Sequence, residues 1–178
     1  AGENRYNEAM IDTPRILMFT GNGKGKTTAA LGMVLRAAGH GMTALVIHFL
    51  KNDDSVGELA GLAKLGTVEV HQAGKGFVPP ADSPKFPAHQ QAAQNGFALL
   101  QSRVAAAEFD LIVLDEICGA ISCGLLETQP VLDFLATLDA SKIVVLTGRN
   151  APAELVDAAD TVSEIHQVKH AYQQKIKA

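Results

Sequence analysis

The stretch GNGKGKTT, residues 21–28, decides how the rest of this chain is interpreted. It directly follows the apolar run 16–19, and it precedes AALGMVLRAAGHG, which reads as a helix that stops at Gly39. In a strand, glycine loop and helix arrangement, backbone N–H groups turn toward an anion and the helix start adds positive partial charge. The stretch therefore predicts a phosphate-binding loop.

The spacing of this loop differs from the usual one. The pattern G-x-x-x-x-G-K-[ST] requires glycine at position 20, where this chain has Thr20, so the loop is one residue short when counted from Gly21. Lys26 would neutralise phosphate oxygens, and the Thr27 hydroxyl is placed to ligate Mg²⁺. We expect the shortening to alter how a bound triphosphate lies.

Short apolar runs recur along the chain, with longer amphipathic stretches between them. Continuous apolarity, as opposed to alternation, indicates strands that are covered on both faces, as in a parallel sheet. The expected strands are 16–19, 44–49, 68–70, 111–114 and 143–146, and the expected helices are 26–38, 58–65, about 90–107 and 130–138. The pattern predicts an α/β fold, an open, mostly parallel sheet with helices on both faces and P-loop NTPase (RecA-like) architecture.

A nucleotide site of this kind also needs an acid at the end of a buried strand. The stretch LIVLDE supplies it, because the apolar run 111–114 ends in Asp115 and Glu116. A carboxylate there can hold Mg²⁺ directly or through water. Both acids are candidate metal ligands beside Thr27, and the sequence does not choose between them.

The bulk composition restricts the class of protein. A chain of 178 residues with 47% hydrophobic content fits one domain, which we place at 14–178 behind a polar, flexible arm at 1–13. The formal net charge of −4 and the absence of a long apolar run argue against nucleic-acid or membrane binding. The start of the chain lacks a signal-peptide pattern, so we expect a cytoplasmic location, with Cys118 and Cys123 as buried free thiols.

The segment QAGKGFVPPADSPKFP, residues 72–87, contains two glycines and four prolines and cannot be regular structure throughout. A functional loop and a disordered connection both fit this composition. Phe77 and Phe86 favour a loop that packs against another group.

Several motifs together resemble one family. They are TGNGKGKTTAA, RAAGHG at 36–41, FLK at 49–51, GE at 57–58, GF at 76–77, VLDE, and LTGRNAPAELVDAADTVSEI followed by VKHAY. In this order, from about Arg15 to Tyr172, they are similar to the P-loop family of ATP:cob(I)alamin adenosyltransferases. The short loop and the C-terminal motifs are more specific than a phosphate loop alone.

The resemblance implies an unusual use of ATP. Co(I) of a corrinoid attacks the C5′ carbon of ATP, and intact triphosphate leaves from a cradle in which the nucleotide lies reversed. Mg²⁺ assists, no general base is required, and the phosphate loop stabilises the leaving group. The resemblance also implies a homodimer and a flavodoxin-type reductant as partner, and it leaves open whether cobalamin or a precursor is the acceptor.

The resemblance implies roles for individual residues, of which Lys26 and Phe77 would be catalytic. The expected nucleotide-binding residues are Gly21, Asn22, Gly23, Lys24, Gly25, Lys26, Thr27, Thr28 and Arg36. Phe77 matches the family's aromatic beneath the corrin ring, and Lys169 and His170 could meet the corrinoid's polar rim. Arg149 follows a strand at the edge where ligands of open α/β sheets bind.

The chain departs from the family pattern at two places. Pro79 stands where an aromatic, often Trp, is usual, and the sequence ends at Ala178 without the family's glutamine-glycine-isoleucine tail. Corrinoid handling could therefore differ, with part of the pocket supplied by another subunit or left unformed. Two alternatives to the transferase are a P-loop kinase or ATPase that releases ADP, and a carrier that binds nucleotide and corrinoid without turnover.

Overall fold

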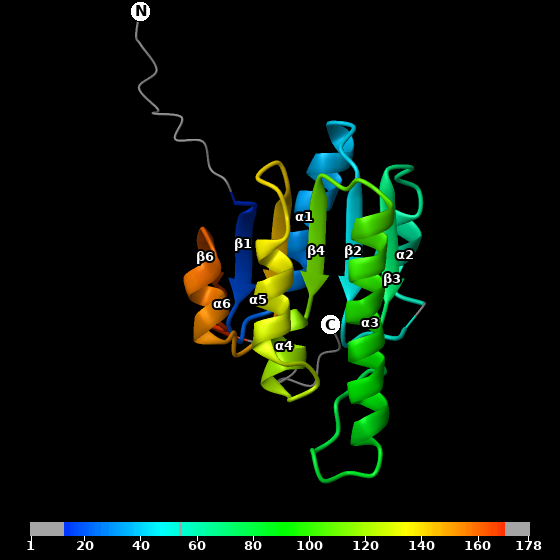
Figure 1. The fold of residues 1–178 in the computed structure, drawn as a ribbon. Coiled ribbons are helices and arrows are strands. Elements are labelled where there is room, and N and C mark those ends of the chain that lie inside the picture. Colours follow the sequence, from blue (N-terminus) through cyan, green and yellow to red (C-terminus); the bar gives the residue numbers. More distant parts are fainter. Residues whose placement is uncertain (1–12, 54, 170–178) are drawn as a thin grey trace, which may run out of the picture.

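A computed structural model describes residues 13–53 and 55–169 of the chain. They form a six-stranded sheet in the order β3-β2-β4-β5-β1-β6, in which every neighbouring pair is parallel (Figure 1). The strands are β1 (Arg15–Thr20), β2 (Ala44–His48), β3 (Val68–Gln72), β4 (Leu111–Asp115), β5 (Ile143–Thr147) and β6 (Thr161–Glu164). The expected open, parallel α/β sheet is confirmed.

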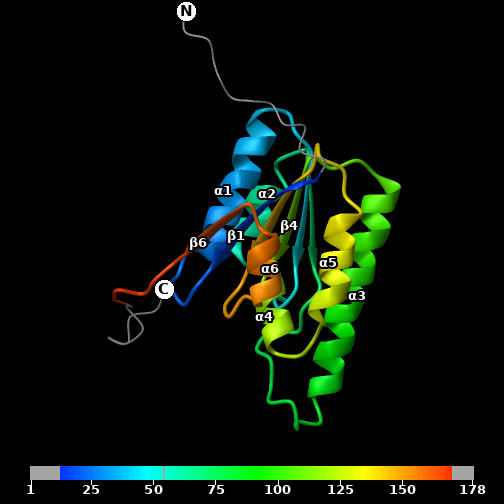
Figure 2. The same ribbon diagram turned by 60° about the vertical axis from the view of Figure 1, so that its left-hand side comes forward.

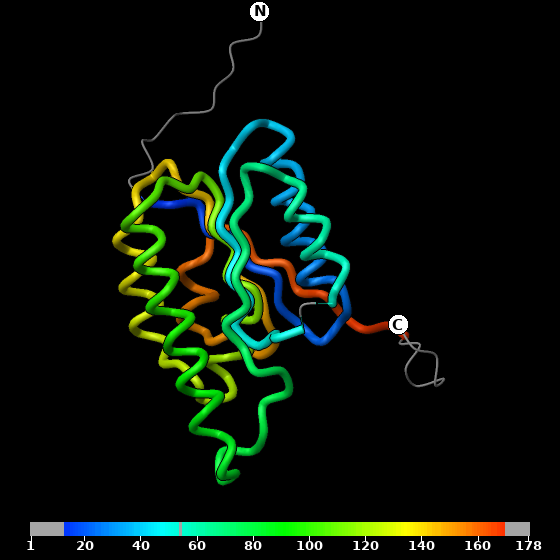
Figure 3. Tube along the Cα trace, turned by 90° about the vertical axis from the view of Figure 1, so that its right-hand side faces the viewer, coloured from blue at the N-terminus to red at the C-terminus, as the bar shows by residue number. Residues whose placement is uncertain are grey.

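The helices cover both faces of this sheet, as Figure 3 shows. One face carries α1 (Lys26–Gly39) and α2 (Gly57–Leu62), and the other carries α3 (Phe86–Ala106), α4 (Ile117–Ser122), α5 (Thr128–Ala136) and α6 (Ala153–Ala158). β2 and β4 are buried along their whole length, which explains their continuous apolar sequences. The core therefore consists of two apolar layers, one on each side of the central strands.

Three elements lie outside the expected set. β6 has the sequence TVSE with all four residues exposed, so it carries no apolar run by which a buried strand is recognised. α4 and α6 have six residues each, too few to display a helical period. α3 begins earlier than expected, at Phe86 with Pro87 in its first turn, and β3 continues to Gln72. The irregular segment is therefore 73–85 and not 72–87.

The topology brings distant parts of the sequence together at one edge. Parallel strands end at the same side of a sheet, so the loop after β1 and the last residues of β2, β4 and β5 are neighbours. Figure 2 shows β6 running beside β1, so that the chain after β6 also returns to this carboxyl edge. The first turns of α3 and the segment before it extend past the same edge (Figure 1).

Three further expectations concern membrane spans, the N-terminal arm and the two cysteines. Among the residues that the structure describes, none of the helices has the length and apolarity needed to span a membrane. The expected arm at 1–13 falls outside the described residues apart from Thr13. Both thiols are free, but only Cys118 is buried; Cys123 is exposed because it follows the end of the short helix α4, so the expectation of two buried thiols is wrong.

Candidate functional site

The loop between β1 and α1 is fixed by its own glycines and by the residue after β6. Gly21 and Gly25 have φ angles of 92° and 124°, in the region that favours glycine. The Gly23 N–H donates to the Ile165 carbonyl over 2.7 Å, and the Ile165 N–H donates to the Thr20 carbonyl over 2.9 Å. A Cβ at Gly23 would lie 2.7 Å from that Ile165 oxygen. The first half of the loop is therefore held against the C-terminal segment.

Lys26 begins α1 and turns its ammonium group back into the loop. The residue is only 6% exposed, and its Nζ donates to the carbonyls of Gly21 at 2.7 Å and Gly23 at 2.9 Å. Burial lowers the pKa of Lys26, Glu116 opposes this shift, and the charge of Arg149 adds to it. A cation held by two carbonyls within a glycine loop is placed to bind an anionic oxygen that enters the loop.

Asp115 ends β4 and is fully buried, with a partner on each side-chain oxygen. Thr27 and Thr147 donate their hydroxyls to Oδ1 over 2.8 and 2.7 Å. His48 Nδ1 donates to Oδ2 over 2.7 Å, and the Lys51 Nζ lies 3.2 Å from the same oxygen. Asp115 therefore joins residues from the ends of β2, β4 and β5 to the first turn of α1.

This network keeps the buried carboxyl group ionised. Burial would raise the pKa of Asp115, but the hydrogen bond from His48 and the charge of Lys51 outweigh it and hold the pKa at about 2. Because the carboxylate can only accept, His48 carries a proton on Nδ1. Asp115 orients the Thr27 hydroxyl from behind and does not itself line the cleft that the loop borders.

Glu116, the next residue, faces the cleft instead. It has a left-handed backbone with φ of 62°, and its N–H donates to the Thr147 hydroxyl over 2.8 Å. Burial and the neighbouring charge of Asp115 raise the pKa of Glu116, although Lys26 and other cations oppose the shift. The two adjacent acids thus have different environments, one enclosed by donors and one open to a ligand.

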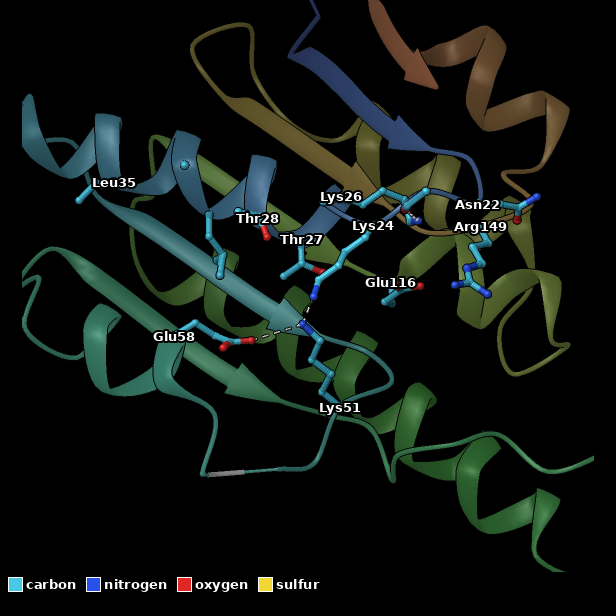
Figure 4. A pocket seen from close by; sticks show the side chains of 14 residues that line it. Asn22, Lys24, Lys26, Thr27, Thr28, Leu35, Lys51, Glu58, Glu116 and Arg149 are labelled. Carbon is cyan, nitrogen blue, oxygen red and sulfur yellow. Dashed lines mark hydrogen bonds and ion pairs between the residues drawn. The ribbon is translucent and has the colours of Figure 1, made fainter. Parts of the chain in front are cut away.

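The cleft between the loop, α1 and the segment after β2 has a volume of about 730 Å³ (Figure 4). Its lining residues are Asn22, Gly23, Lys24, Gly25, Lys26, Thr27, Thr28, Leu31, Gly32, Leu35, Lys51, Glu58, Glu116 and Arg149. Four of these are cations and two are carboxylates, although the whole chain has a formal net charge of −4. Positive charge concentrated in one concave site suits a polyphosphate.

The structure brings together most of the predicted nucleotide-binding residues. The run from Asn22 to Thr28 lines the cleft together with Glu116 and Arg149, while Gly21 contributes the carbonyl that holds Lys26. The sequence analysis gave no role to Lys51 or Glu58, which line the opposite wall in Figure 4. The signal that could have found them is their place in two of the quoted motifs, FLK at 49–51 and GE at 57–58.

Sequence reasoning also missed an apolar part of the cleft. Leu31, Gly32 and Leu35 line it from α1, and Leu35 is 61% exposed. A Cβ on Gly32 would meet no heavy atom within 4 Å, so this face of the helix is open. The helical pattern of 26–38 gave no sign that this face borders the phosphate loop.

Arg36 is not brought into this cleft. It lies at the far end of α1, ten residues or about 15 Å along the helix from Lys26. There it lines a separate pocket with Leu111 and Ile143, which begin β4 and β5 at the amino edge of the sheet. Arg36 therefore does not line the cleft, and its expected contact with the nucleotide stays a prediction.

Phe77 lies in the segment 73–85 and is 92% exposed. It lines a shallow pocket of about 370 Å³ with Val78, Pro79, Pro80, Ala81 and Cys123, and it does not line the cleft. Phe86, by contrast, packs against the core from the start of α3. Lys169 is exposed and outside the cleft, and His170 lies beyond the described residues.

The fold and the cleft define a class of protein. A parallel sheet whose first strand leads through a glycine loop into a helix, with an acid ending a nearby buried strand, is the architecture of P-loop nucleotide-binding proteins. A solved structure of a KaiC-like protein from the archaeon Pyrococcus horikoshii has the same fold, with a TM-score of 0.51 and 16% identity over 89% of this chain and 75% of that one.

Within this class, the chain belongs to the family described as ATP:corrinoid adenosyltransferase BtuR/CobO/CobP, whose sequence model matches residues 12–178. A corrinoid adenosyltransferase from Pseudomonas aeruginosa is 41% identical over 99% of this chain and 86% of its own length. The corrinoid adenosyltransferase CobA of Salmonella typhimurium is 35% identical over 98% of this chain and 87% of its own length. The resemblance inferred from the motifs is confirmed.

Proposed function

We propose that this protein transfers the 5′-deoxyadenosyl group of ATP to Co(I) of a corrinoid and releases triphosphate, in the synthesis or salvage of adenosylcobalamin. The observation that carries the proposal is the extent of the family match. Residues 12–178 include the phosphate loop, the paired acids and the Phe77 segment, so every part that the reaction needs falls within it.

The cleft supplies the charge that this reaction requires. Co(I) donates an electron pair to C5′, the C5′–O bond breaks, and its electrons remain on the triphosphate oxygen. Lys26, Lys24 and the loop N–H groups line the cleft, and we assign to them the stabilisation of the charge that develops on the leaving group. Attack on carbon by cobalt transfers no proton, so the mechanism requires no base from the protein.

The residues of the cleft fit a Mg²⁺ ion. Thr27 donates its hydroxyl proton to Asp115; its oxygen accepts a long hydrogen bond from Lys51 over 3.4 Å and keeps a second lone pair for a metal, and Glu116 offers a carboxylate in the same cleft. Within 13–53 and 55–169 the structure has no group of three or more His, Cys, Asp or Glu side chains that could hold a metal, so nucleotide oxygens would complete the site. We assign direct contact to Thr27 and Glu116, and orientation to Asp115; a bound ion would neutralise phosphate charge.

On the corrinoid side, we propose that Phe77 packs beneath the corrin ring in the place of a lower axial ligand, with Lys169 and His170 at the polar rim. An aromatic ring that is 92% exposed has apolar surface to bury against a flat macrocycle. A homodimer would give this segment a second wall, and its support here is the separation of Phe77 from the cleft of its own chain.

The remaining assignments follow from the same activity. Reduction of the cobalt would come from a separate flavodoxin-type protein, since Cys118 is buried and Cys123 stands alone at the surface. Two free thiols are consistent with a cytoplasmic location. We assign residues 14–178 to one nucleotide-binding domain and 1–13 to an N-terminal arm.

The test is an anaerobic reaction with ATP, Mg²⁺ and chemically reduced cobalamin, followed by the visible spectrum and by phosphate analysis. We expect a light-sensitive alkylcobalt product and one triphosphate for each cobalt–carbon bond. ADP with orthophosphate would instead identify a kinase or ATPase, and tight binding of both ligands without product would identify a carrier.

A further inference from the structure

Lys51 is a cation of the cleft that comes from outside the phosphate loop. It follows β2, and its Nζ lies 3.4 Å from the Thr27 hydroxyl oxygen, 3.2 Å from Asp115 Oδ2 and 3.7 Å from Glu58 Oε1. Figure 4 shows Lys51 and Glu58 facing the loop residues across the cleft. Three groups from three elements therefore place this ammonium group beside the first turn of α1.

Lys51 differs from Lys26 in the exposure of its side chain and in how tightly its ammonium group is held. Lys26 is 6% exposed and held by two loop carbonyls at 2.7 and 2.9 Å, whereas the Lys51 side chain is 31% exposed. The two carboxylates near Lys51 lie at 3.2 and 3.7 Å, the outer range of charged contacts. A lysine with a flexible stem and loose partners can move its charge toward a new anion without breaking a tight hydrogen bond.

Asp115 does not depend on Lys51 to satisfy its oxygens. The hydroxyls of Thr27 and Thr147 and the ring of His48 already donate to it at 2.7 to 2.8 Å. The Lys51 ammonium adds charge to this network, and it still lines the cleft. Lys51 is therefore held near Asp115 on one side and is accessible to a ligand in the cleft on the other.

We propose that Lys51 is a polyphosphate-binding cation in addition to the lysines of the loop, and that it pairs with the leaving triphosphate from the wall opposite Lys26. The inference deepens the proposed function and rests on it for its catalytic part. Charge grows on the triphosphate oxygen as the C5′–O bond breaks, and a mobile cation follows it more readily than one already fixed by the loop. An interaction that strengthens in the transition state raises kcat more than it lowers KM.

The binding test uses inorganic triphosphate and the full chain, without corrinoid. Calorimetry compares wild type with Lys51→Met, Lys51→Arg and Lys64→Met, the last a control that removes an exposed lysine outside the cleft. Lys51→Met should weaken triphosphate binding about tenfold, the size of one charged hydrogen bond. Lys51→Arg should recover most of the affinity, and Lys64→Met should bind as wild type.

A kinetic test separates this inference from the proposed function. In the adenosyl-transfer assay, Lys51→Met should lower kcat about tenfold and change the KM for ATP less, with a thermal melt close to that of wild type. Unchanged triphosphate affinity and kcat in Lys51→Met, in an assay where wild type forms the alkylcobalt product, would overturn the role of Lys51 and leave the function intact. Weakened triphosphate binding beside a wild type that releases ADP would support Lys51 as a polyphosphate ligand and remove only the adenosyl transfer.

Discussion

The phosphate loop and the segment 73–85 both lie beyond the carboxyl edge of the sheet, but they are built in opposite ways. The loop is fixed by glycine geometry, by Ile165 and by a lysine that is 6% exposed. The segment 73–85 presents Phe77 at 92% exposure, beside the exposed Cys123. The phosphate-binding part is thus built within the chain, while the segment 73–85, which we propose for the corrinoid, offers exposed apolar surface for a ligand or partner.

The proposed function accounts for this difference through the chemistry of its two ligands, ATP and the corrinoid. A phosphate is bound by backbone N–H groups and by one or two cations, which a single short loop can provide. A corrin ring is large and mostly apolar at its face, so its binding depends on area buried against several segments. We therefore expect variants of the loop and variants of the segment 73–85 to fail in separable steps.

Lys26→Ala should produce the largest effect, because it removes the cation at the centre of the phosphate-binding part. We expect kcat/KM for ATP to fall about 10²- to 10³-fold, the range for loss of one preorganised charged contact. Corrinoid binding, measured by the absorbance of oxidised cobalamin, should remain near that of wild type. Loss of both ligands together would show that the two parts are one unit.

Asp115→Asn tests the buried carboxylate that accepts the hydrogen bond from Thr27 at the start of α1. The pKa of Asp115 is about 2, below the 3.8 of an ordinary aspartate, so its contribution to stability is full above about pH 5 and is lost as the pH falls through 2. The variant should therefore be less stable than wild type by about 2 kcal/mol at pH 6, and the two should converge in acid.

Urea unfolding at a series of pH values measures this difference. Asp133→Asn is the matched control, because Asp133 is exposed on α5 and far from the loop in the fold. A constant gap between wild type and Asp115→Asn from pH 6 to pH 2.5 would mean that packing, and not ionisation, explains the loss. Corrinoid binding at Phe77 should not change in either variant, since neither Asp115 nor Asp133 lines the Phe77 pocket.

Phe77→Ala should act on the segment 73–85 alone. A ring that is 92% exposed contributes little to folding, so the melting temperature and ATP affinity should match wild type. The KM for reduced cobalamin should rise about tenfold, as expected when one buried aromatic contact is removed from a complex. Val162→Ala, which trims an exposed apolar residue on β6, is the control. A change in ATP affinity in Phe77→Ala would contradict the expectation that nucleotide and corrinoid binding fail separately.

The regular parts of the molecule could be predicted from sequence, and the parts that depend on tertiary contacts could not. The loop residues, the paired acids and the parallel sheet were predictable, because glycine spacing, a following Lys-Thr and continuous apolar strands each have one common structural meaning. β6 could not be predicted, because its sequence TVSE is exposed along its whole length and lacks an apolar run. Its role is nevertheless structural, because the next residue, Ile165, holds the loop through its backbone, and such a contact does not depend on the identity of the Ile165 side chain.

The position of charged side chains was the less predictable part of the site. Lys51 and Glu58 belong to the cleft only because β2 and β4 are neighbours, and strand order is not written in local sequence. Arg36 was expected at the nucleotide from the family motif; ten residues of helix place it outside the cleft lining, and its contact with the nucleotide stays a prediction. A motif match specifies which residues recur, whereas helix rise and strand order specify where they lie.

Labelling of the cysteine thiols should give the smallest effect on activity. It compares a buried thiol with an exposed one beside Phe77. Burial raises the pKa of the Cys118 thiol to about 12, so almost none of it is thiolate at pH 7.5, whereas Cys123 is exposed. We expect a maleimide to add once per chain, at Cys123, as seen by mass spectrometry, and Cys123→Ser to remain unlabelled. Because Cys123 lines the Phe77 pocket, the adduct should slow adenosylation a few-fold through corrinoid binding and leave the affinity for triphosphate unchanged. An adduct that instead weakened triphosphate binding would place the pocket and the cleft in one coupled site.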